Sequence, residues 1–316
     1  MFFNGLQGVG AELLRQPVSY RVLFYDLHGT CISIIRSVFV LLKKMIMDFN
    51  IKLSNGQVLK GIIQSPGDNT KAVIVMVPGR GDHIQRYVPW ADLFIKEGFA
   101  FTGVDLPGHG RSEGRRGHIK SYSLIEEMIN ILLDSCRKTF PGIPVYLYGQ
   151  SMGGGIVLDY LLRNNPKIKG AIVTSPWLRL SFEPAQISVI MASLLKNLVP
   201  GLIQPAGLIV SHLSHDAIVG ENFKSDPLTH NKISLSLYHG AMNAASYSLE
   251  HASDLKVPTL IMHGSDDLIT SPEGSREFAE KTGMAELKIW ANGYHELHNE
   301  PFKDDVFKYI LNWIKR

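Results

Sequence analysis

The sequence predicts an α/β fold, in which a mostly parallel, doubly wound sheet carries helices on both faces and an inserted helical cap. Two observations indicate this fold. From about residue 48, short apolar runs alternate with helical segments, a rhythm typical of strand–helix–strand units. The apolar runs are also unbroken, as residues 72–77 (AVIVMV) illustrate, and unbroken runs are typical of strands that are buried on both faces.

Each element follows from its local pattern. The turn signal Asn55-Gly56 predicts a hairpin between strands at residues 51–53 and 58–63. Buried strands are predicted at residues 72–77, 100–104, 145–148, 171–174, 259–263 and 286–290. Helices are predicted between them at residues 87–97, 122–139, 154–164, 273–281 and 302–314. In such sheets, ligands bind at the carboxyl ends of the strands.

The strand–helix rhythm is interrupted at residues 177–240. No strand-like run there could form a sheet core. Apolar residues instead recur at helical spacing before Pro200-Gly201, namely Ile187, Met191, Leu194, Leu195 and Leu198. We therefore predict a helical cap at 177–240, inserted between core segments 48–176 and 241–316. The apolar surface of the cap either packs on the core or lines a channel for an acyl chain, and the sequence leaves both readings open.

Residues 1–47 are predicted to be an N-terminal extension. Five cationic and two acidic residues there account for the whole formal charge of +3. Three basic residues interrupt the apolar run at 32–46, which falls short of the ~20 residues of a membrane span. Two interpretations stay open. The run forms an amphipathic helix that packs on the body, dimerises or contacts a membrane surface, or the natural chain starts at Met45 or Met47 and the preceding residues are not native.

Composition narrows the class of protein. Hydrophobic residues make up 45% of the chain and charged residues 19%, as in globular domains with a core. The body is formally neutral and has no nucleic-acid-binding motif, so nucleic acid is excluded as a partner. Cys31 and Cys136 form neither a metal-binding spacing nor a disulfide framework. These features favour a reducing, cytoplasmic setting, with membrane association through the cap or the N-terminal segment left open.

One pentapeptide carries the chemistry. Gly149-Gln150-Ser151-Met152-Gly153 matches the pattern G-x-S-x-G, directly after one predicted strand and before a predicted helix. In this context the serine occupies a sharp strand-to-helix turn, where it is exposed for nucleophilic attack. The helix N-terminus also favours negative charge that develops near the serine. We predict that Ser151 is a catalytic nucleophile.

A serine nucleophile needs a base, and the base needs an orienting carboxylate. The acid is expected at a strand end in His263-Gly264-Ser265-Asp266-Asp267, where the spacing from Gly264 favours Asp267 over Asp266. The base is expected in the segment Gly293-Tyr294-His295 before the last helix. His298 is the alternative base, although we expect it to be a surface or supporting residue.

The remaining predictions for the site concern the oxyanion and metals. The oxyanion that forms during attack needs two donors. We predict the backbone N–H groups of Met152 and of Arg80, which lies in the loop after the strand 72–77. The two histidines of His295-Glu296-Leu297-His298 are spaced three residues apart, which differs from the HExxH zinc motif. We therefore predict neither a metal nor another cofactor.

Together, these motifs resemble the monoacylglycerol lipase and lysophospholipase group of the α/β hydrolases, which is also classed with the serine aminopeptidase-like hydrolases. The resemblance covers residues 48–316 and five motifs of this sequence. The segment 79–87 resembles HGxGEHxxRY, residues 105–114 resemble DxxGHGxSEG, and residues 149–154 resemble GHSMGG. The acid and histidine segments match as well. The resemblance implies a fatty acyl ester as substrate and the α/β-hydrolase fold.

Three positions depart from the pattern of the group, where Pro78, Asp82 and Gln150 replace histidine, glutamate and histidine. None of these changes removes a predicted catalytic atom. The resemblance implies structural roles for the polar residues of the first two motifs, Asp82, His83, His109 and Ser112. It also implies that Asp226-Pro227-Leu228 returns the chain from cap to core.

From these residues we predict a serine carboxylic-ester hydrolase that forms an acyl-enzyme from monoacylglycerol- or lysophospholipid-like esters. Three alternatives remain. An acyltransferase would use the same acyl-enzyme. An aminopeptidase would need acidic cap residues, of which Asp216, Glu221 and Asp226 are available. A non-catalytic binding protein on the same scaffold would typically lack one of the three predicted catalytic residues, and none is missing. Oligomeric state, acyl-chain length and headgroup are not predicted.

Overall fold

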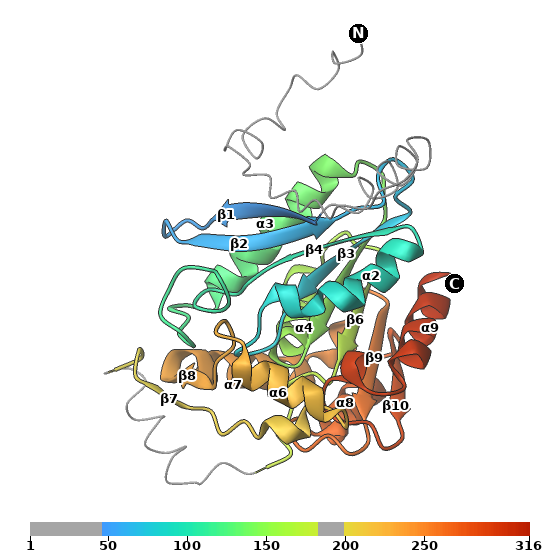
Figure 1. Cartoon of the computed structure of the whole chain (residues 1–316). Helices are drawn as coiled ribbons and strands as arrows, with labels where there is room; N and C mark the ends of the chain where they lie inside the picture. Colours follow the sequence, from blue (N-terminus) through green and yellow to red (C-terminus); the bar gives the residue numbers. More distant parts are fainter. Residues whose placement is uncertain (1–45, 183–198) are drawn as a thin grey trace, which may run out of the picture.

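The computed structural model describes residues 46–182 and 199–316. An eight-stranded sheet forms its centre, in the order β1-β2-β4-β3-β5-β6-β9-β10 (Figure 1). The strands are β1 (Ile46–Lys52), β2 (Val58–Gln64), β3 (Ala72–Val77), β4 (Phe99–Val104), β5 (Val145–Gln150), β6 (Gly170–Thr174), β9 (Thr259–Gly264) and β10 (Ala285–Trp290). The predicted α/β fold is confirmed.

The sheet is mixed at one edge and parallel elsewhere. β1 and β2 form the predicted antiparallel hairpin, and β2 is antiparallel to β4. All pairings from β4 to β10 are parallel. β1 begins at Ile46, so the last two residues of the predicted extension pair with Ile63 and Gln64 of β2.

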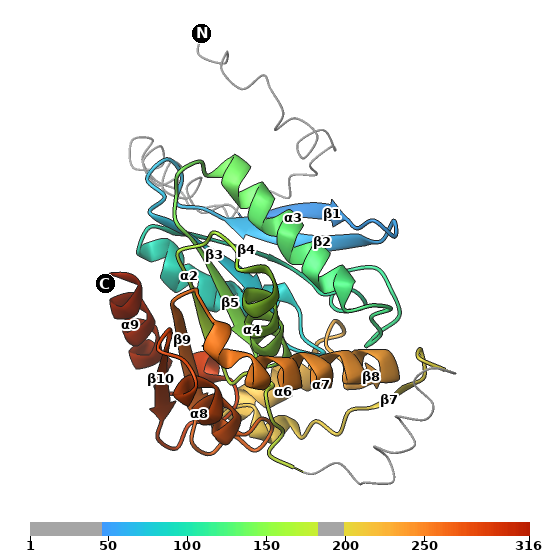
Figure 2. The ribbon, with the colours of Figure 1, turned by 180° about the vertical axis from the view of Figure 1, so that it is seen from behind.

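Helices cover the sheet on both faces, and alternate residues of the strands point to two hydrophobic clusters. Val73 and Val75 pack with α3 (Ser123–Thr139), α4 (Met152–Asn164) and Phe278 of α8 (Pro272–Glu280). Ile74 and Met76 pack on the other face with α2 (Val88–Lys96) and α9 (Lys303–Ile314). The two views show these helix layers on opposite sides of the sheet (Figures 1 and 2). Because side chains alternate along a strand, an unbroken apolar run satisfies both layers.

One predicted strand differs from its expected environment. Residues 286–290 were expected to be buried on both faces, but every residue of β10 is only half-buried. β10 pairs with β9 alone and forms an edge of the sheet. An edge strand keeps one side open, which explains why β10 carries Glu286 and Lys288 among its apolar residues.

The described part of the predicted cap contains a two-stranded antiparallel sheet and a helix. β7 (Ile203–Pro205) pairs with β8 (Lys232–Ser234), and α6 (Ala217–Ser225) lies between them in sequence. The predicted boundary between residues 240 and 241 falls within α7 (Leu235–Glu250), which the sequence did not predict. The predicted apolar helix around Ile187–Leu198 and the apolar run 32–45 lie outside the described residues. No helix of the described chain is long and apolar enough to cross a bilayer.

The strand order reverses beside β3, because β4 lies on one side of it and β5 on the other. Open α/β sheets bind ligands in the crevice at the carboxyl ends of the strands next to such a switch point. The loop after β3 carries Arg80, and the turn after β5 carries Ser151. The topology therefore brings the two segments that the sequence singled out to one edge of the sheet.

Candidate active site

Ser151 lies on a strained turn between β5 and α4. Its backbone has φ 57° and ψ −122°, a region that residues other than glycine rarely occupy. The turn is held from both sides, since the Ser151 N–H donates to the Thr174 carbonyl at 2.9 Å and the Ser151 carbonyl accepts from the N–H groups of Gly155 and Trp177. Strain of this kind persists where the surroundings enforce it, often at functional sites.

The glycines of the motif have a steric cause. A Cβ atom at Gly149 would overlap the Gly153 carbonyl oxygen, and one at Gly153 would overlap the Val77 carbonyl oxygen. A side chain at Gly149 would therefore push α4 away from β5, and one at Gly153 would push the turn away from β3. The pattern G-x-S-x-G follows from this close packing of the backbone.

Three predicted residues meet at the carboxyl edge of the sheet. Nε2 of His295 lies 2.8 Å from Oγ of Ser151, and Nδ1 of His295 lies 2.7 Å from Oδ2 of Asp267. Ser151 follows β5, Asp267 follows β9, and His295 follows β10. The side chains form one hydrogen-bonded chain from a hydroxyl through an imidazole to a carboxylate.

The Asp267 carboxylate is fully buried and well supplied with donors. Its Oδ1 accepts from the backbone N–H groups of Ile269 and Thr270 at 2.8 and 3.0 Å. Its Oδ2 accepts from the Thr270 hydroxyl at 3.0 Å and lies 3.2 Å from Nε2 of His263. Burial alone would raise its pKa, but His295 and His263 hold the pKa of Asp267 well below the ordinary value. The carboxylate therefore stays ionised at neutral pH.

Of the alternatives for the acid and the base, Asp267 and His295 are the ones whose side chains meet at Ser151. Asp266 is exposed and accepts a hydrogen bond from Ser265, so it does not face His295. His298 is buried, so of the two expectations, a surface residue or a supporting residue, the first is wrong. Its ring stacks on Tyr87 at a centroid distance of 5.0 Å. Burial lowers the pKa of His298 to about 4, although Glu296 opposes the shift. His298 is therefore a neutral packing residue.

The predicted oxyanion donors flank the serine. An ideal Cβ at Gly79 would lie 3.3 Å from Cβ of Ser151, so the loop after β3 touches the nucleophile turn. The N–H of Arg80 makes no hydrogen bond within the described chain, and Met152 occupies the first position of α4, where the N–H has no helical acceptor. Both N–H groups are available to an oxygen atom bound beside Ser151.

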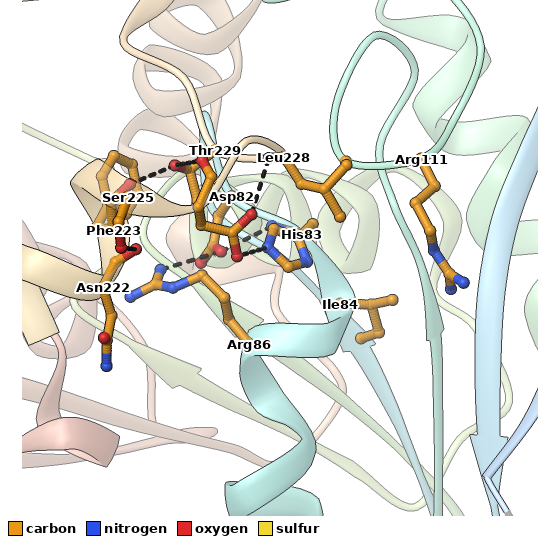
Figure 3. A network of polar contacts seen from close by, with 12 residues as sticks. Asp82, His83, Ile84, Arg86, Arg111, Asn222, Phe223, Ser225, Leu228 and Thr229 are labelled. Carbon is orange, nitrogen blue, oxygen red and sulfur yellow. Dashed lines mark hydrogen bonds and ion pairs between the residues drawn. The ribbon is translucent and has the colours of Figure 1, made fainter.

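Two ion-paired groups fix the loop that carries Arg80. Arg86 binds Glu296 through both guanidinium nitrogens at 3.1 and 3.0 Å, and Asp82 at 3.0 Å. His83 binds the Asp226 carboxylate at 2.9 Å. In Figure 3 the Asp82, His83 and Arg86 side chains lie together and face the segment from Phe223 to Thr229. Because that segment ends α6, the His83 contact joins the predicted cap-to-core return to the core.

The turn after β4, residues 105–114, is held in place by hydrogen bonds to neighbouring segments. The Ser112 hydroxyl donates to the Asp105 carbonyl at 2.6 Å and accepts from the N–H of Lys60. The Asp105 carboxylate accepts from the N–H groups of Ile84 and Arg111. His109 is fully buried. These contacts tie the turn after β4 to the loop after β3.

A cavity of about 690 Å³ opens beside Ser151 and His295. Most of its lining is apolar and comes from the region between β6 and β9, with two residues from the loop after β9: Trp177, Leu180, Phe182, Ala206, Leu208, Ile209, Leu213, Phe223, Ile233, Tyr238, Leu268 and Ile269. Sites for small organic molecules usually combine such an apolar wall with a few polar groups. Within the described residues, no group of three or more histidine, cysteine or acidic side chains could hold a metal ion.

The sequence reading missed His263. This fully buried residue ends β9, its Nδ1 lies 2.7 Å from Oγ of Ser275, and its Nε2 lies 2.9 Å from the Thr270 carbonyl. The carbonyl requires a proton on Nε2, so the same N–H faces Asp267. A polar residue within the apolar run 259–263 was the available signal, but the run itself shows no contact between His263 and the acid.

The fold and the serine turn together define an α/β hydrolase, and comparison with known proteins specifies the family. A family model described as serine aminopeptidase, S33, matches residues 68–302. The chain therefore belongs to this family of α/β hydrolases, and to its lipase and esterase branch as the relatives show. The resemblance seen in the sequence motifs is confirmed.

The individual relatives are similar over most of this chain. An uncharacterized abhydrolase domain-containing protein of Dictyostelium discoideum is 33% identical over 84% of this chain, which spans only 28% of that protein. The phospholipase YtpA of Bacillus subtilis is 30% identical, with 76% of this chain and 94% of YtpA covered. The crystal structure of Paleococcus ferrophilus monoacylglycerol lipase superposes with a TM-score of 0.72 at 27% identity, covering 85% of this chain and 98% of that one.

Proposed function

We propose that this protein is a serine carboxylic-ester hydrolase that acts on monoacylglycerol- or lysophospholipid-like esters through an acyl-enzyme. The observation that carries the proposal is the hydrogen-bonded chain Ser151–His295–Asp267 beside a mostly apolar cavity. A hydroxyl that donates to an imidazole can lose its proton as it attacks a carbonyl carbon. The apolar wall suits the hydrocarbon part of a lipid ester.

In the first half-reaction, Oγ of Ser151 attacks the ester carbonyl carbon while Nε2 of His295 takes the hydroxyl proton. The Asp267 carboxylate orients the imidazole and stabilises its protonated form. The N–H groups of Arg80 and Met152 bind the oxyanion. When this tetrahedral intermediate collapses, the bond to the alcohol oxygen breaks, and His295 returns its proton to the leaving alcohol.

In the second half-reaction, water attacks the acyl-enzyme as His295 removes one proton from it. The bond between the acyl carbon and Oγ of Ser151 then breaks, and the proton passes to Oγ. The products are a fatty acid and the restored serine. No step of this scheme needs a metal or an organic cofactor.

The rival activities on this scaffold have less support. An aminopeptidase would need an acidic side chain to hold a free amine, yet in the described chain neither Asp216, Glu221 nor Asp226 lines the cavity. Asp216 instead caps α6 through the N–H of Ile218, and Asp226 binds His83. A binding protein would not need the hydrogen-bonded side chains beside the cavity. An acyltransferase would share every residue of the proposed scheme.

A panel of substrates tests the proposal. The wild-type protein is incubated with a 1-monoacylglycerol, a lysophospholipid, p-nitrophenyl esters from short to long acyl chains and an aminoacyl p-nitroanilide. We expect release of fatty acid from the esters and no release of nitroaniline. Added glycerol reports acyl transfer, since a transferase would form acylglycerol in place of free acid. Hydrolysis of the anilide alone contradicts the proposal.

We also propose that residues 1–44 are dispensable for catalysis and that residues 177–240 act as the cap that selects the acyl chain. The described chain has every proposed catalytic residue between Gly79 and His295. A protein that starts at Met47 tests the first part. We expect it to fold and to hydrolyse p-nitrophenyl esters at the wild-type rate, and loss of activity in a folded truncated protein contradicts it.

A further inference from the structure

The Arg80 guanidinium is a charged group of the cavity that has no partner in the described chain. Arg80 lines the same cavity as Ser151, and no hydrogen bond or ion pair to its side chain occurs within residues 46–182 and 199–316. Its Nη1 atom is shielded from solvent and has no partner there. Arg86, six residues later, has two carboxylate partners. Cationic groups that are shielded from solvent normally have such partners, so Nη1 of Arg80 departs from this rule.

The groups around Arg80 do not neutralise it. Burial lowers the pKa of the Arg80 guanidinium to about 10, and no carboxylate opposes the shift, so the group stays a cation at neutral pH. Burial, Arg80 and Arg116 together lower the pKa of His230 to about 4. The His230 ring lies 4.7 Å from the ring of His109. The neighbourhood of Arg80 is therefore basic, with neutral imidazoles.

An unused donor lies in the same neighbourhood. Nδ1 of His230 accepts from the N–H of Lys232 at 3.3 Å, which leaves the proton on Nε2. That Nε2 atom is buried and has no partner in the described chain. Nη1 of Arg80 and Nε2 of His230 are therefore both without a hydrogen-bond partner in the described chain, but of the two residues only Arg80 lines the cavity.

The acids of the cavity are already engaged. Asp82 and Glu296 line it, but both bind Arg86. Asp82 also accepts from the Tyr87 hydroxyl at 2.8 Å. Arg86 therefore neutralises both carboxylates. Arg80, which has no ion-pair partner in the described chain, lies on the loop after β3, next to the nucleophile turn.

We propose that the Arg80 side chain binds a phosphate group, so that this hydrolase prefers acyl esters whose alcohol carries a phosphate, such as a 1-acylglycerol 3-phosphate, over neutral monoacylglycerols. This inference rests on the proposed function. A guanidinium binds phosphate through two parallel, charge-assisted hydrogen bonds. Arg80 would then serve the substrate twice, with its backbone N–H at the oxyanion and its side chain at the phosphate.

A matched pair of substrates tests the inference. We compare kcat/KM for a 1-acylglycerol and for its 3-phosphate with the same acyl chain, both below the concentration at which they form micelles. The proteins are the wild type, Arg80→Met, Arg80→Lys and the control Arg137→Met, whose exposed side chain pairs with Asp134 on α3. The readout is the ratio of the two kcat/KM values, and circular dichroism reports that each variant is folded.

We expect the wild type to favour the phosphate ester, and Arg80→Met to lower the ratio roughly 10- to 100-fold, as the loss of a hydrogen-bonded charge predicts. Arg80→Lys should retain part of the preference, and Arg137→Met all of it. A ratio that is the same in the wild type and Arg80→Met overturns the inference, even though both esters are cleaved. If the wild type cleaves neither ester, the proposed function fails instead.

A second arm distinguishes the source of the phosphate. Inorganic phosphate is added to reactions with the neutral ester and, separately, to reactions with the phosphate ester. If the phosphate of the substrate occupies the site, inorganic phosphate should inhibit cleavage of the phosphate ester competitively in the wild type, and more weakly in Arg80→Met. If inorganic phosphate instead accelerates cleavage of the neutral ester in the wild type alone, the site takes a free anion and the stated substrate preference is overturned.

Discussion

Nε2 of His263 lies 3.2 Å from Oδ2 of Asp267, and both side chains are fully buried. The acid of the proposed catalytic group therefore faces two imidazoles, one of which also contacts Ser151. His263 donates to the Thr270 carbonyl and is fixed by Ser275 on α8. His263 therefore holds Asp267 against β9 and α8, whereas His295 connects Asp267 to Ser151.

Replacing His263 tests this division of roles. His263→Leu leaves Ser275 and the Thr270 carbonyl without their partner and removes one donor from the Asp267 carboxylate. We expect the free energy of unfolding to fall by about 1–3 kcal/mol and kcat to fall less than in Asp267→Asn. Urea denaturation and ester kinetics measure the two effects. A loss of kcat as large as that of Asp267→Asn would instead assign His263 a direct part in catalysis.

Two adjacent aspartates give a matched pair of variants. Asp267→Asn removes the charge that orients His295 and should lower kcat roughly 10⁴-fold. Asp266→Asn changes an exposed side chain and should leave kcat within about twofold of the wild type. Steady-state hydrolysis of a p-nitrophenyl ester measures both. Similar losses in the two variants would contradict the assignment of Asp267 as the acid.

The close packing of the nucleophile turn against β3 predicts that a side chain at Gly153 destabilises the fold. Gly153→Ala places a methyl group against the Val77 carbonyl, and we expect it to lower the free energy of unfolding by about 1–3 kcal/mol and to reduce activity. Gly283→Ala is the control, because its Cβ would have nothing within 4 Å and its backbone φ lies outside the left-handed region. Urea midpoints of the two variants measure the difference. Equal midpoints would show that the turn tolerates a side chain.

The lowered pKa of Glu296 predicts that the stability of the fold depends on pH. Burial alone would raise its pKa, but Arg86 and His298 lower the pKa of Glu296 to about 2 from its ordinary 4.5. A carboxylate with a depressed pKa stabilises the fold above its unfolded pKa and loses this contribution as the pH falls through the folded pKa. The contribution of ionisation is roughly 3 kcal/mol at neutral pH. The stability difference between wild type and Glu296→Gln should therefore shrink from pH 5 to pH 2.

Chemical denaturation at a series of pH values measures this difference. Because Arg86 loses one of its two carboxylate partners in Glu296→Gln, the wild type should be clearly more stable at pH 7. Asp304→Asn, in the exposed first turn of α9, serves as the control. A stability difference that stays constant down to pH 2 would contradict the lowered pKa.

Local sequence patterns predicted most of the fold. Each buried strand packs against helices on both faces of the sheet, so its whole run of residues is apolar. The helix α7 escaped prediction. Its residues Leu235–Glu250 have a burial pattern set by contact with α4, and its sequence holds few charges to mark an exposed face. Similarly, β10 was assigned as buried because its apolar residues resemble those of a central strand, but strand order is a property of the whole sheet.

The site residues that a sequence motif marks were predicted. Those that only tertiary packing brings to the site were missed. Ser151, Asp267 and His295 follow strand ends in a fixed chain order, so their meeting was expected. His298 stacks on Tyr87, and His263 faces Asp267, through contacts between segments far apart in the sequence. That Arg80 has no partner within residues 46–182 and 199–316 is likewise a fact of tertiary structure, since the tripeptide Arg80-Gly81-Asp82 itself offers a carboxylate.

The central claim is that ester hydrolysis proceeds through Ser151. The most direct measurement is the rate of p-nitrophenyl ester hydrolysis by Ser151→Ala beside the wild type, with circular dichroism to show that both are folded. The account predicts that the variant loses activity roughly 10³- to 10⁶-fold and that a fluorophosphonate labels the wild type alone. Turnover by folded Ser151→Ala near the wild-type rate would contradict it.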